Sequence, residues 1–213
     1  MEPLASKIRP RRLEDFVGQD HLAGEVKPLN VGIKQKHLFS FIFWGPPGTG
    51  KTTLAKIYAN CLNAKLYELS AVSAGKADIK KIINEDSSGI SKVLFLDEIH
   101  RFNKSQQDFL LPFVEKGEIT LIGATTENPS FEVIPALLSR CRVFVLNELS
   151  DENMTAIIKR TGFKIDKKSE EWLINMANGD ARQAITMLEN TNELYKKITL
   201  ENLKNALQSK FLR

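Results

Sequence analysis

Short apolar runs alternate with segments of helical spacing along the first 149 residues. The runs are apolar on both faces, which is typical of strands buried inside a parallel sheet. A parallel sheet covered on both sides by helices is therefore expected, which places the chain in the α/β class. The five predicted strands lie within residues 37–45, 65–71, 92–98, 118–130 and 141–149.

Helices are expected between these strands, over residues 51–63, 76–86, 103–117 and 133–140. Pro112 lies inside the third of them. Proline lacks the N–H that a helix interior requires, so a kink or a break is expected there. Residues 1–38 are mixed in character and contain several prolines and glycines, which are typical turn residues.

The pattern changes at Ser150, after which no strand is expected. A Ser-Asp cap opens a helix over residues 150–162, and residues 168–197 have the pattern of two helices separated at Asn178-Gly179. A fourth helix is expected over residues 199–209. The chain thus divides into an α/β core, residues 1–149, and an all-helical domain, residues 150–213.

The composition, 42% hydrophobic and 26% charged, is that of an ordinary soluble globular protein. No apolar run approaches the roughly 20 residues of a membrane span, and the first residues lack the apolar core of a signal peptide. Cys61 and Cys141 lie far apart in the sequence and are expected to be reduced thiols of a cytoplasmic protein. The net charge of +4 permits a nucleic-acid partner without requiring one.

The segment GPPGTGKT, residues 45–52, fits the pattern GxxxxGK[ST] and stands between a predicted strand and a predicted helix. Glycines let such a loop wrap closely around phosphate oxygens, and the helix that follows favours an anion at its start. Lys51 is expected to reach the β- and γ-phosphates of ATP, and Thr52 to ligate Mg²⁺. The predicted nucleotide-binding residues are Gly45, Pro46, Pro47, Gly48, Thr49, Gly50, Lys51, Thr52 and Thr53.

Two adjacent carboxylates end the third predicted strand. Asp97 is expected to hold Mg²⁺, directly or through water, and Glu98 to orient and polarise an attacking water. A module that only binds a nucleotide does not need the second carboxylate. The pair therefore favours an ATPase.

Polar side chains also follow the fourth strand, where Thr125, Thr126 and Asn128 would reach the same edge of the sheet as the phosphate loop. Asn128-Pro129-Ser130 equally suits a capped turn before a helix at Phe131, and the pattern does not separate the two interpretations. His100 is expected near the nucleotide in a structural or polar-contact role, because the three histidines lack the spacing of a metal site.

In their order along the chain, GPPGTGKT, LFLDE, GATTENPSF, LLSRCR and NGDAR resemble the motifs of AAA+ ATPases of the clamp-loader clade. Within the clade, residues 3–22 and 100–140 are especially similar to the family of bacterial replication-associated recombination protein A and the eukaryotic Werner-helicase-interacting protein. The resemblance covers essentially the whole chain and implies a P-loop core followed by a helical lid. That family has a further C-terminal helical region, so the chain is expected to be the N-terminal ATPase part.

The resemblance also implies roles by position. Thr126 matches the residue called sensor 1, Arg182 matches sensor 2 on the lid, and Arg140 of the Ser-Arg-Cys motif is implied to act in trans on a neighbour's ATP. The alternative for Arg140 is a salt bridge at the edge of the core. Ser70 stands where clamp loaders often carry an asparagine that restrains the catalytic glutamate. The implied adenine-side residues are Arg9, Pro10, Val17, Gly18 and Gln19. The implied catalytic residues are Lys51, Glu98, Thr126, Asn128, Arg140 in trans and Arg182.

The family further implies a DNA-dependent ATPase that remodels DNA or DNA-bound proteins at replication forks and single-strand/double-strand junctions. It implies a tetrameric homo-oligomer, nucleoid-associated in the cytoplasm, with single-strand-binding protein and replisome proteins as candidate partners. Alternatives are a clamp-loader-like or Holliday-junction-motor-like subunit and a non-catalytic nucleotide-binding scaffold. Two groups of cations could meet DNA phosphates or equally form solvated helix faces. The groups are Lys76, Lys80 and Lys81, and Arg101 and Lys104.

Overall fold

The computed structural model describes residues 2–208, and the chain forms two compact units. The α/β unit comprises Pro10–Pro46 and Lys51–Asn147. The helical unit comprises Pro47–Gly50 and the described parts of Met1–Arg9 and Glu148–Arg213. The domains expected from the sequence, 1–149 and 150–213, differ from this division in the placement of residues 2–9, 47–50 and 148–149.

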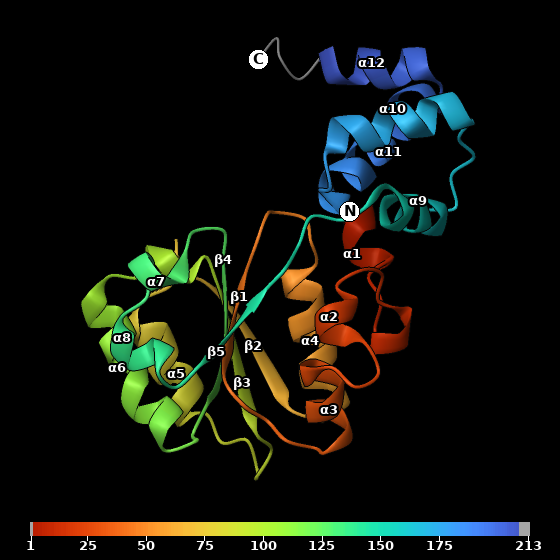
Figure 1. Ribbon diagram of the computed structural model, residues 1–213. Coiled ribbons are helices and arrows are strands. Elements are labelled where there is room, and N and C mark those ends of the chain that lie inside the picture. The colour runs from red at the N-terminus through yellow and green to blue at the C-terminus, as the bar shows by residue number, and fades with distance from the viewer. Residues whose placement is uncertain (1, 209–213) are drawn as a thin grey trace. The chain divides into compact units, whose positions relative to one another are not determined.

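A five-stranded parallel sheet forms the centre of the α/β unit, with the strand order β2-β3-β4-β1-β5 (Figure 1). The strands are β1 Phe41–Trp44, β2 Lys65–Ser70, β3 Lys92–Asp97, β4 Thr120–Thr125 and β5 Arg142–Val145. All five predicted strands are confirmed, and each is shorter than the segment in which it was expected.

Helices cover both faces of this sheet (Figure 1). Successive side chains of a strand point to opposite faces of the sheet. In β1, Phe41 and Phe43 belong to one buried cluster and Ile42 to the other, so the strand is buried on both faces and its sequence is apolar throughout. One face carries α2 Asp20–Ala23, α3 Pro28–Lys34 and α4 Lys51–Cys61. The other face carries α5 Lys76–Asn84, α6 Lys104–Glu115, α7 Pro129–Glu132 and α8 Pro135–Leu138.

A kink or a break was expected at Pro112. The helix α6 is continuous through this residue, so the break does not occur. The start of the helix is well fixed, since Asn103 Oδ1 accepts from the Gln106 N–H at 2.9 Å and Gln106 Oε1 accepts from the Asn103 N–H at 3.0 Å. Buried Leu110 anchors its middle. The helix therefore tolerates one missing N–H close to its carboxyl end.

Some short elements differ from the expected ones. The helix expected over residues 133–140 is only Pro135–Leu138, and α7 precedes it, at the place of the helix that the capped-turn interpretation put at Phe131. The segment before β1 contains the 3₁₀ helix η1 Leu13–Asp15 as well as α2 and α3. These elements lack the long apolar period from which helices are recognised in a sequence.

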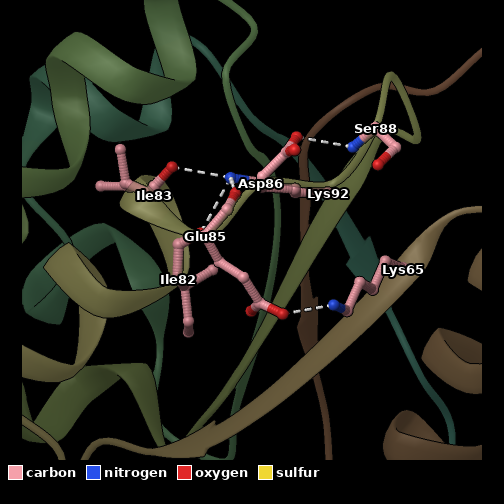
Figure 2. A network of polar contacts seen from close by, with 7 residues as sticks. All are labelled: Lys65, Ile82, Ile83, Glu85, Asp86, Ser88 and Lys92. Carbon is pink, nitrogen blue, oxygen red and sulfur yellow. Dashed lines mark hydrogen bonds and ion pairs between the residues drawn. The ribbon is translucent and has the colours of Figure 1, made fainter.

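A polar network anchors α5 at the amino ends of β2 and β3 (Figure 2). Figure 2 shows Lys92 reaching the end of the helix, where its Nζ donates to the carbonyls of Ile82, Ile83 and Glu85 at 2.9, 2.7 and 2.5 Å. Lys65 forms an ion pair with the Glu85 side chain. A cation suits the carboxyl end of a helix, whose last carbonyls have no partner within it. The network fixes α5 against the sheet edge that carries no candidate site residue.

The helical unit contains the four helices expected from the sequence, and α1 Leu4–Lys7 joins them through Leu4 N–H, which donates to Glu189 Oε1 at 2.8 Å. The expected break is confirmed, because Asn178 and Gly179 have φ of 44° and 77°. The helices are α9 Asp151–Arg160, α10 Lys167–Ala177, α11 Ala181–Tyr195 and α12 Leu200–Gln208. Residue 209, the last of the fourth predicted helix, lies outside the described residues.

Within residues 2–208, no helix has both the length and the apolar character of a transmembrane span.

Candidate active site

The carboxyl ends of the central strands bring the main candidate residues to one edge of the sheet. Trp44 pairs in register with Thr125, and Leu96 of β3 pairs with Gly123 of β4. The residues that follow these strands therefore share an edge, and Gly45 N–H donates to the Thr125 carbonyl at 3.2 Å. The chain passes from β1 across β4 and β3 to β2, and it passes from β4 across β1 to β5. The connections that leave the adjacent strands β1 and β4 therefore run in opposite directions. Parallel sheets bind ligands at such switch points.

Lys51 is the first residue of α4 and lies over the start of the phosphate loop. Its Nζ donates to the carbonyls of Gly45 and Pro46, both at 2.6 Å. The side chain thus folds back toward the loop and places a cation beside the amino end of a helix. Both the ammonium and the helix end favour an anion at this point.

Glycine is required in the loop for steric reasons. A Cβ at Gly45 would lie 2.3 Å from the Leu146 carbonyl oxygen. Within the helical unit, a Cβ at Gly48 would lie 1.9 Å from Asp180 Oδ1, and φ at Gly48 is 69°. Such a backbone is the kind of cradle in which phosphate oxygens are bound by N–H groups. The positive φ at Gly48 and Gly50 and the helix that starts at Lys51 are the features expected of a phosphate-binding loop with this sequence pattern.

Asp97 ends β3, and Glu98 follows in a left-handed conformation with φ of 53°. This conformation is uncommon for a residue with a side chain, and such strain is concentrated at functional sites. Asp97 Oδ1 accepts from the Glu98 N–H at 3.1 Å, and Glu98 Oε2 lies 4.0 Å from Arg101 Nε. The sequence predicted the carboxylate pair but neither the backbone turn nor the contact with Arg101.

Ser70 lies beside Asp97, with which it pairs in register. Its Oγ accepts from the Val72 N–H at 3.4 Å, within its own turn. The structure therefore brings Ser70 next to the first carboxylate of the pair, whereas Glu98 forms an ion pair with Arg101.

The end of β4 carries a second group of polar contacts. Thr125 is buried, its Oγ1 lies 3.0 Å from His100 Nδ1, and it accepts from the Glu127 N–H at 2.9 Å. Asn128 caps α7, with its Oδ1 accepting from the Ser130 N–H at 3.0 Å, so the capped turn is present. Thr126 is exposed. The contact between His100 and Thr125 joins the ends of β3 and β4 and could not be read from the sequence.

Arg140 lies on the surface of the α/β unit between α8 and β5. Its Nη1 donates to the Ala136 carbonyl at 2.6 Å and to Ser139 Oγ at 3.0 Å, and its Nη2 forms an ion pair with Glu115. The neighbouring Cys141 is buried, and burial raises the pKa of its thiol to about 12. Arg142 lies over the ring of Phe39, at 5.1 Å from the centroid.

The candidates for the adenine side are divided between the two units. Arg9 belongs to the helical unit, and Pro10, Val17 and Gly18 belong to the α/β unit. Gln19 follows them with φ of 60°; its Nε2 donates to the Asn147 carbonyl at 2.7 Å and its Oε1 accepts from the Asn147 N–H at 2.9 Å. This two-way bond ties the turn at residues 17–19 to the segment after β5.

Arg182 lies in the first turn of α11 and is exposed. Asp180 caps this helix, because its Oδ1 accepts from the Gln183 N–H at 2.9 Å. The same Oδ1 is the atom that a side chain at Gly48 would meet. Within the helical unit, the start of α11 thus lies close to the middle of the phosphate loop.

Mg²⁺ usually binds through one or two protein oxygens and completes its shell with water and substrate phosphates. Thr52 and Asp97 are oxygen donors of this kind. Residues 2–208 contain no group of three or more His, Cys, Asp and Glu side chains that could hold a metal by themselves. The donor set therefore fits a metal that arrives with a nucleotide.

The comparison with family models matches residues 41–149, from β1 to the residue before Ser150, to the ATPase family associated with various cellular activities (AAA). The chain belongs to the AAA family of ATPases. The matched residues include the phosphate loop, both carboxylates, the polar groups after β4 and Arg140. The identification as an ATPase domain agrees with the expectation from the sequence.

Curated relatives are similar over 88% of this chain. Replication-associated recombination protein A of Coxiella burnetii is 48% identical over 200 residues, and that of Escherichia coli K12 is 45% identical over 203 residues. ATPase WRNIP1 of Dictyostelium discoideum is 46% identical over 201 residues. The chain spans 46%, 45% and 23% of the length of these three proteins.

Among solved structures, RuvB of Thermotoga maritima has a similar fold. Its P216G mutant superposes with a TM-score of 0.78 at 26% identity, covering 94% of this chain and 73% of that one. The structure described as the RuvB Holliday junction branch migration motor gives a TM-score of 0.74 at 26% identity, covering 95% and 72%.

Proposed function

We propose that this domain hydrolyses ATP with Mg²⁺, and that the whole protein uses the energy to remodel DNA or DNA-bound proteins at replication forks. The observation that carries the proposal is the strand register, which brings Gly45, the first residue of the phosphate loop, and the pair Asp97-Glu98 to one sheet edge. The similarity to proteins named for replication-associated recombination supports the biological setting.

The chain's own residues account for each part of the reaction. Lys51 and the start of α4 neutralise the β- and γ-phosphates. Thr52 and Asp97 would hold Mg²⁺, which would neutralise further phosphate charge. Glu98 orients a water in line with the γ-phosphate and polarises it. Thr126 and Asn128 contribute polar contacts from the end of β4. Catalysis then depends on positioning and on stabilising charge that spreads over the transferred group.

The remaining roles follow the family pattern. Arg9, Pro10, Val17 and Gly18 line the adenine side, and Arg182 of the helical unit serves as a sensor of the bound nucleotide. Arg140 acts on the ATP of a neighbouring copy, so the active protein is a homo-oligomer, a tetramer in the proposal. A guanidinium supplied in this way is worth about 10³–10⁵ in rate.

DNA contact is proposed at the starts of α5 and α6. Lys76 Nζ donates to Ser105 Oγ at 2.7 Å and lies 5.8 Å from the centroid of Phe109, which brings the two helix starts together. Lys80 and Lys104 are exposed on the same two helices. Two helix amino ends with cations beside them suit phosphates of a DNA backbone and offer no means of reading bases.

The test is the ATP turnover of the complete protein with single-stranded, duplex, gapped and forked DNA. We expect forked or gapped DNA to raise turnover. The double variant Lys80→Ala/Lys104→Ala should lose most of the stimulation while keeping its DNA-free rate. The matched control, Lys27→Ala/Lys34→Ala, removes two cations near α3 and should retain the stimulation. Turnover that no DNA changes would contradict the proposal.

A second candidate is a branch-migration motor, which the likeness to RuvB favours. A four-way junction added as a further arm of the same experiment separates the two. Preferential stimulation by the junction, together with its migration, would support the motor.

A further inference from the structure

Three contacts within its own chain hold the guanidinium of Arg140. Nη1 donates to the Ala136 carbonyl and to Ser139 Oγ, at 2.6 and 3.0 Å, and Nη2 pairs with a carboxylate oxygen of Glu115. A guanidinium has five N–H donors. Contacts with residues 2–208 use three of them, which leaves two donors for other partners.

Glu115 is an unusual residue for its place in α6. It is the last residue of the helix, where the partial negative charge of the helix end disfavours a carboxylate. The last turn of α6 holds no basic residue, and the adjacent Lys116 lies 3.9 Å from Glu118. The Glu115 carboxylate is thus unfavourable for its own helix, and Arg140 is the cation that compensates it.

Hydrogen bonds join the two segments that carry Glu115 and Arg140. Buried Gln107 of α6 accepts from the Ile134 N–H at 2.9 Å and donates to the Phe102 and Glu132 carbonyls, both at 2.9 Å. These bonds fix α6 against the segment that leads into α8. A carboxylate at the end of α6 can therefore set the direction of a side chain that follows α8.

We propose that Glu115 is a positioning residue for Arg140: it holds the guanidinium in one orientation so that the two remaining donors are ready for a neighbour's phosphoryl oxygens. The inference rests on the proposed role of Arg140 in trans. A long arginine side chain at the surface otherwise samples many rotamers, and ordering it in advance removes that cost from the catalytic step.

Both partners are partly exposed, with side-chain accessibilities of 38% for Arg140 and 46% for Glu115. Exposed ion pairs contribute little to stability. Substitution of Glu115 should therefore leave the fold intact, and its effect should be seen in catalysis.

The test measures kcat and KM for ATP in the complete protein carrying Glu115→Ala, Glu115→Gln or the control Glu118→Gln. Glu118 is a similarly exposed acid with a lysine partner, at 42% side-chain accessibility. We expect Glu115→Ala to lower kcat about five-fold, the upper range for an exposed pair, without changing KM, because ATP binds the phosphate loop of another copy. Glu115→Gln keeps an acceptor oxygen and should lose less. Glu118→Gln should match the unaltered protein.

A second measurement places Glu115→Ala in an Arg140→Ala background, where it should have no further effect. An unchanged or raised kcat for Glu115→Ala, or a further loss in that background, would overturn the inference. If Arg140→Ala itself leaves kcat unchanged, the proposed role of Arg140 fails instead. Thermal unfolding of each variant separates a loss of fold from a loss of positioning, and Glu115→Gln serves if the alanine variant does not fold.

Discussion

Thr125 Oγ1 and His100 Nδ1 lie 3.0 Å apart and join the ends of β4 and β3. The threonine is buried, and the histidine stands shortly after Glu98, so the contact links the turn of the proposed catalytic base to the strand that leads to Thr126. A change at one strand end can thus reach the other through a single hydrogen bond.

Replacing His100 with alanine should lower ATP turnover about five-fold and the free energy of unfolding by about 1 kcal/mol, the typical net value of one hydrogen bond. The control is His37→Ala, which removes an exposed histidine ahead of β1, at the opposite edge of the sheet. Steady-state turnover and urea denaturation of both variants check the prediction. Equal effects of the two substitutions on turnover would show that the contact has no special role.

Glu98→Gln should keep ATP binding and reduce turnover by at least about 100-fold, because an amide cannot polarise the attacking water as a carboxylate does. Calorimetric titration with ATP and Mg²⁺ measures the binding, and phosphate release measures the turnover. Asp97→Asn is the matched comparison and should instead raise the Mg²⁺ concentration needed for half-maximal turnover. Full turnover in the Glu98→Gln variant would remove Glu98 from the catalytic role.

The two cysteines should differ in reactivity. Burial raises the pKa of the Cys141 thiol to about 12, so alkylation of the native chain at pH 8–9.5 should leave it unmodified, whereas exposed Cys61 is labelled increasingly as pH rises. Mass spectrometry after timed labelling distinguishes them. Since the folded state holds this proton more tightly, the free energy of unfolding should also fall as pH rises from 9 towards 12. Rapid native labelling of Cys141 would contradict its burial.

Pro112→Ala should raise the free energy of unfolding by about 1–2 kcal/mol. Alanine restores the missing N–H in α6, which stabilises the folded state. It also makes the unfolded chain more flexible, which offsets only part of that stabilisation. Thermal or urea unfolding measures it. Pro129 begins α7, where no helix bond is lost, so Pro129→Ala is the control and should not stabilise the fold. A destabilised Pro112→Ala variant would show that the ring itself is needed.

The sheet and the phosphate loop were predictable because their signals are local. Apolar runs such as that before Gly45 mark buried strands, and the order of strand, loop and helix confirms the motif. Contacts between distant segments were not predictable, and the pair of Glu115 with Arg140 and the two-way bond of Gln19 with Asn147 are of this kind. The left-handed turn at Glu98 has no sequence signal either, since glycine or asparagine usually marks such a turn. Of the kink or break expected at Pro112, the break does not occur, because tertiary packing outweighs a local penalty.

In the proposed mechanism, ATP is hydrolysed at an edge built by Lys51 and Glu98 of one copy and completed by Arg140 of another. The most direct test is the ATP turnover of complete Arg140→Ala and Lys51→Ala proteins, alone and mixed in equal amounts. Each alone should be almost inactive. On mixing, about a quarter of the interfaces in a ring combine an intact loop with an intact Arg140, so turnover should recover to that order. No recovery in mixed oligomers of proven composition would contradict the claim.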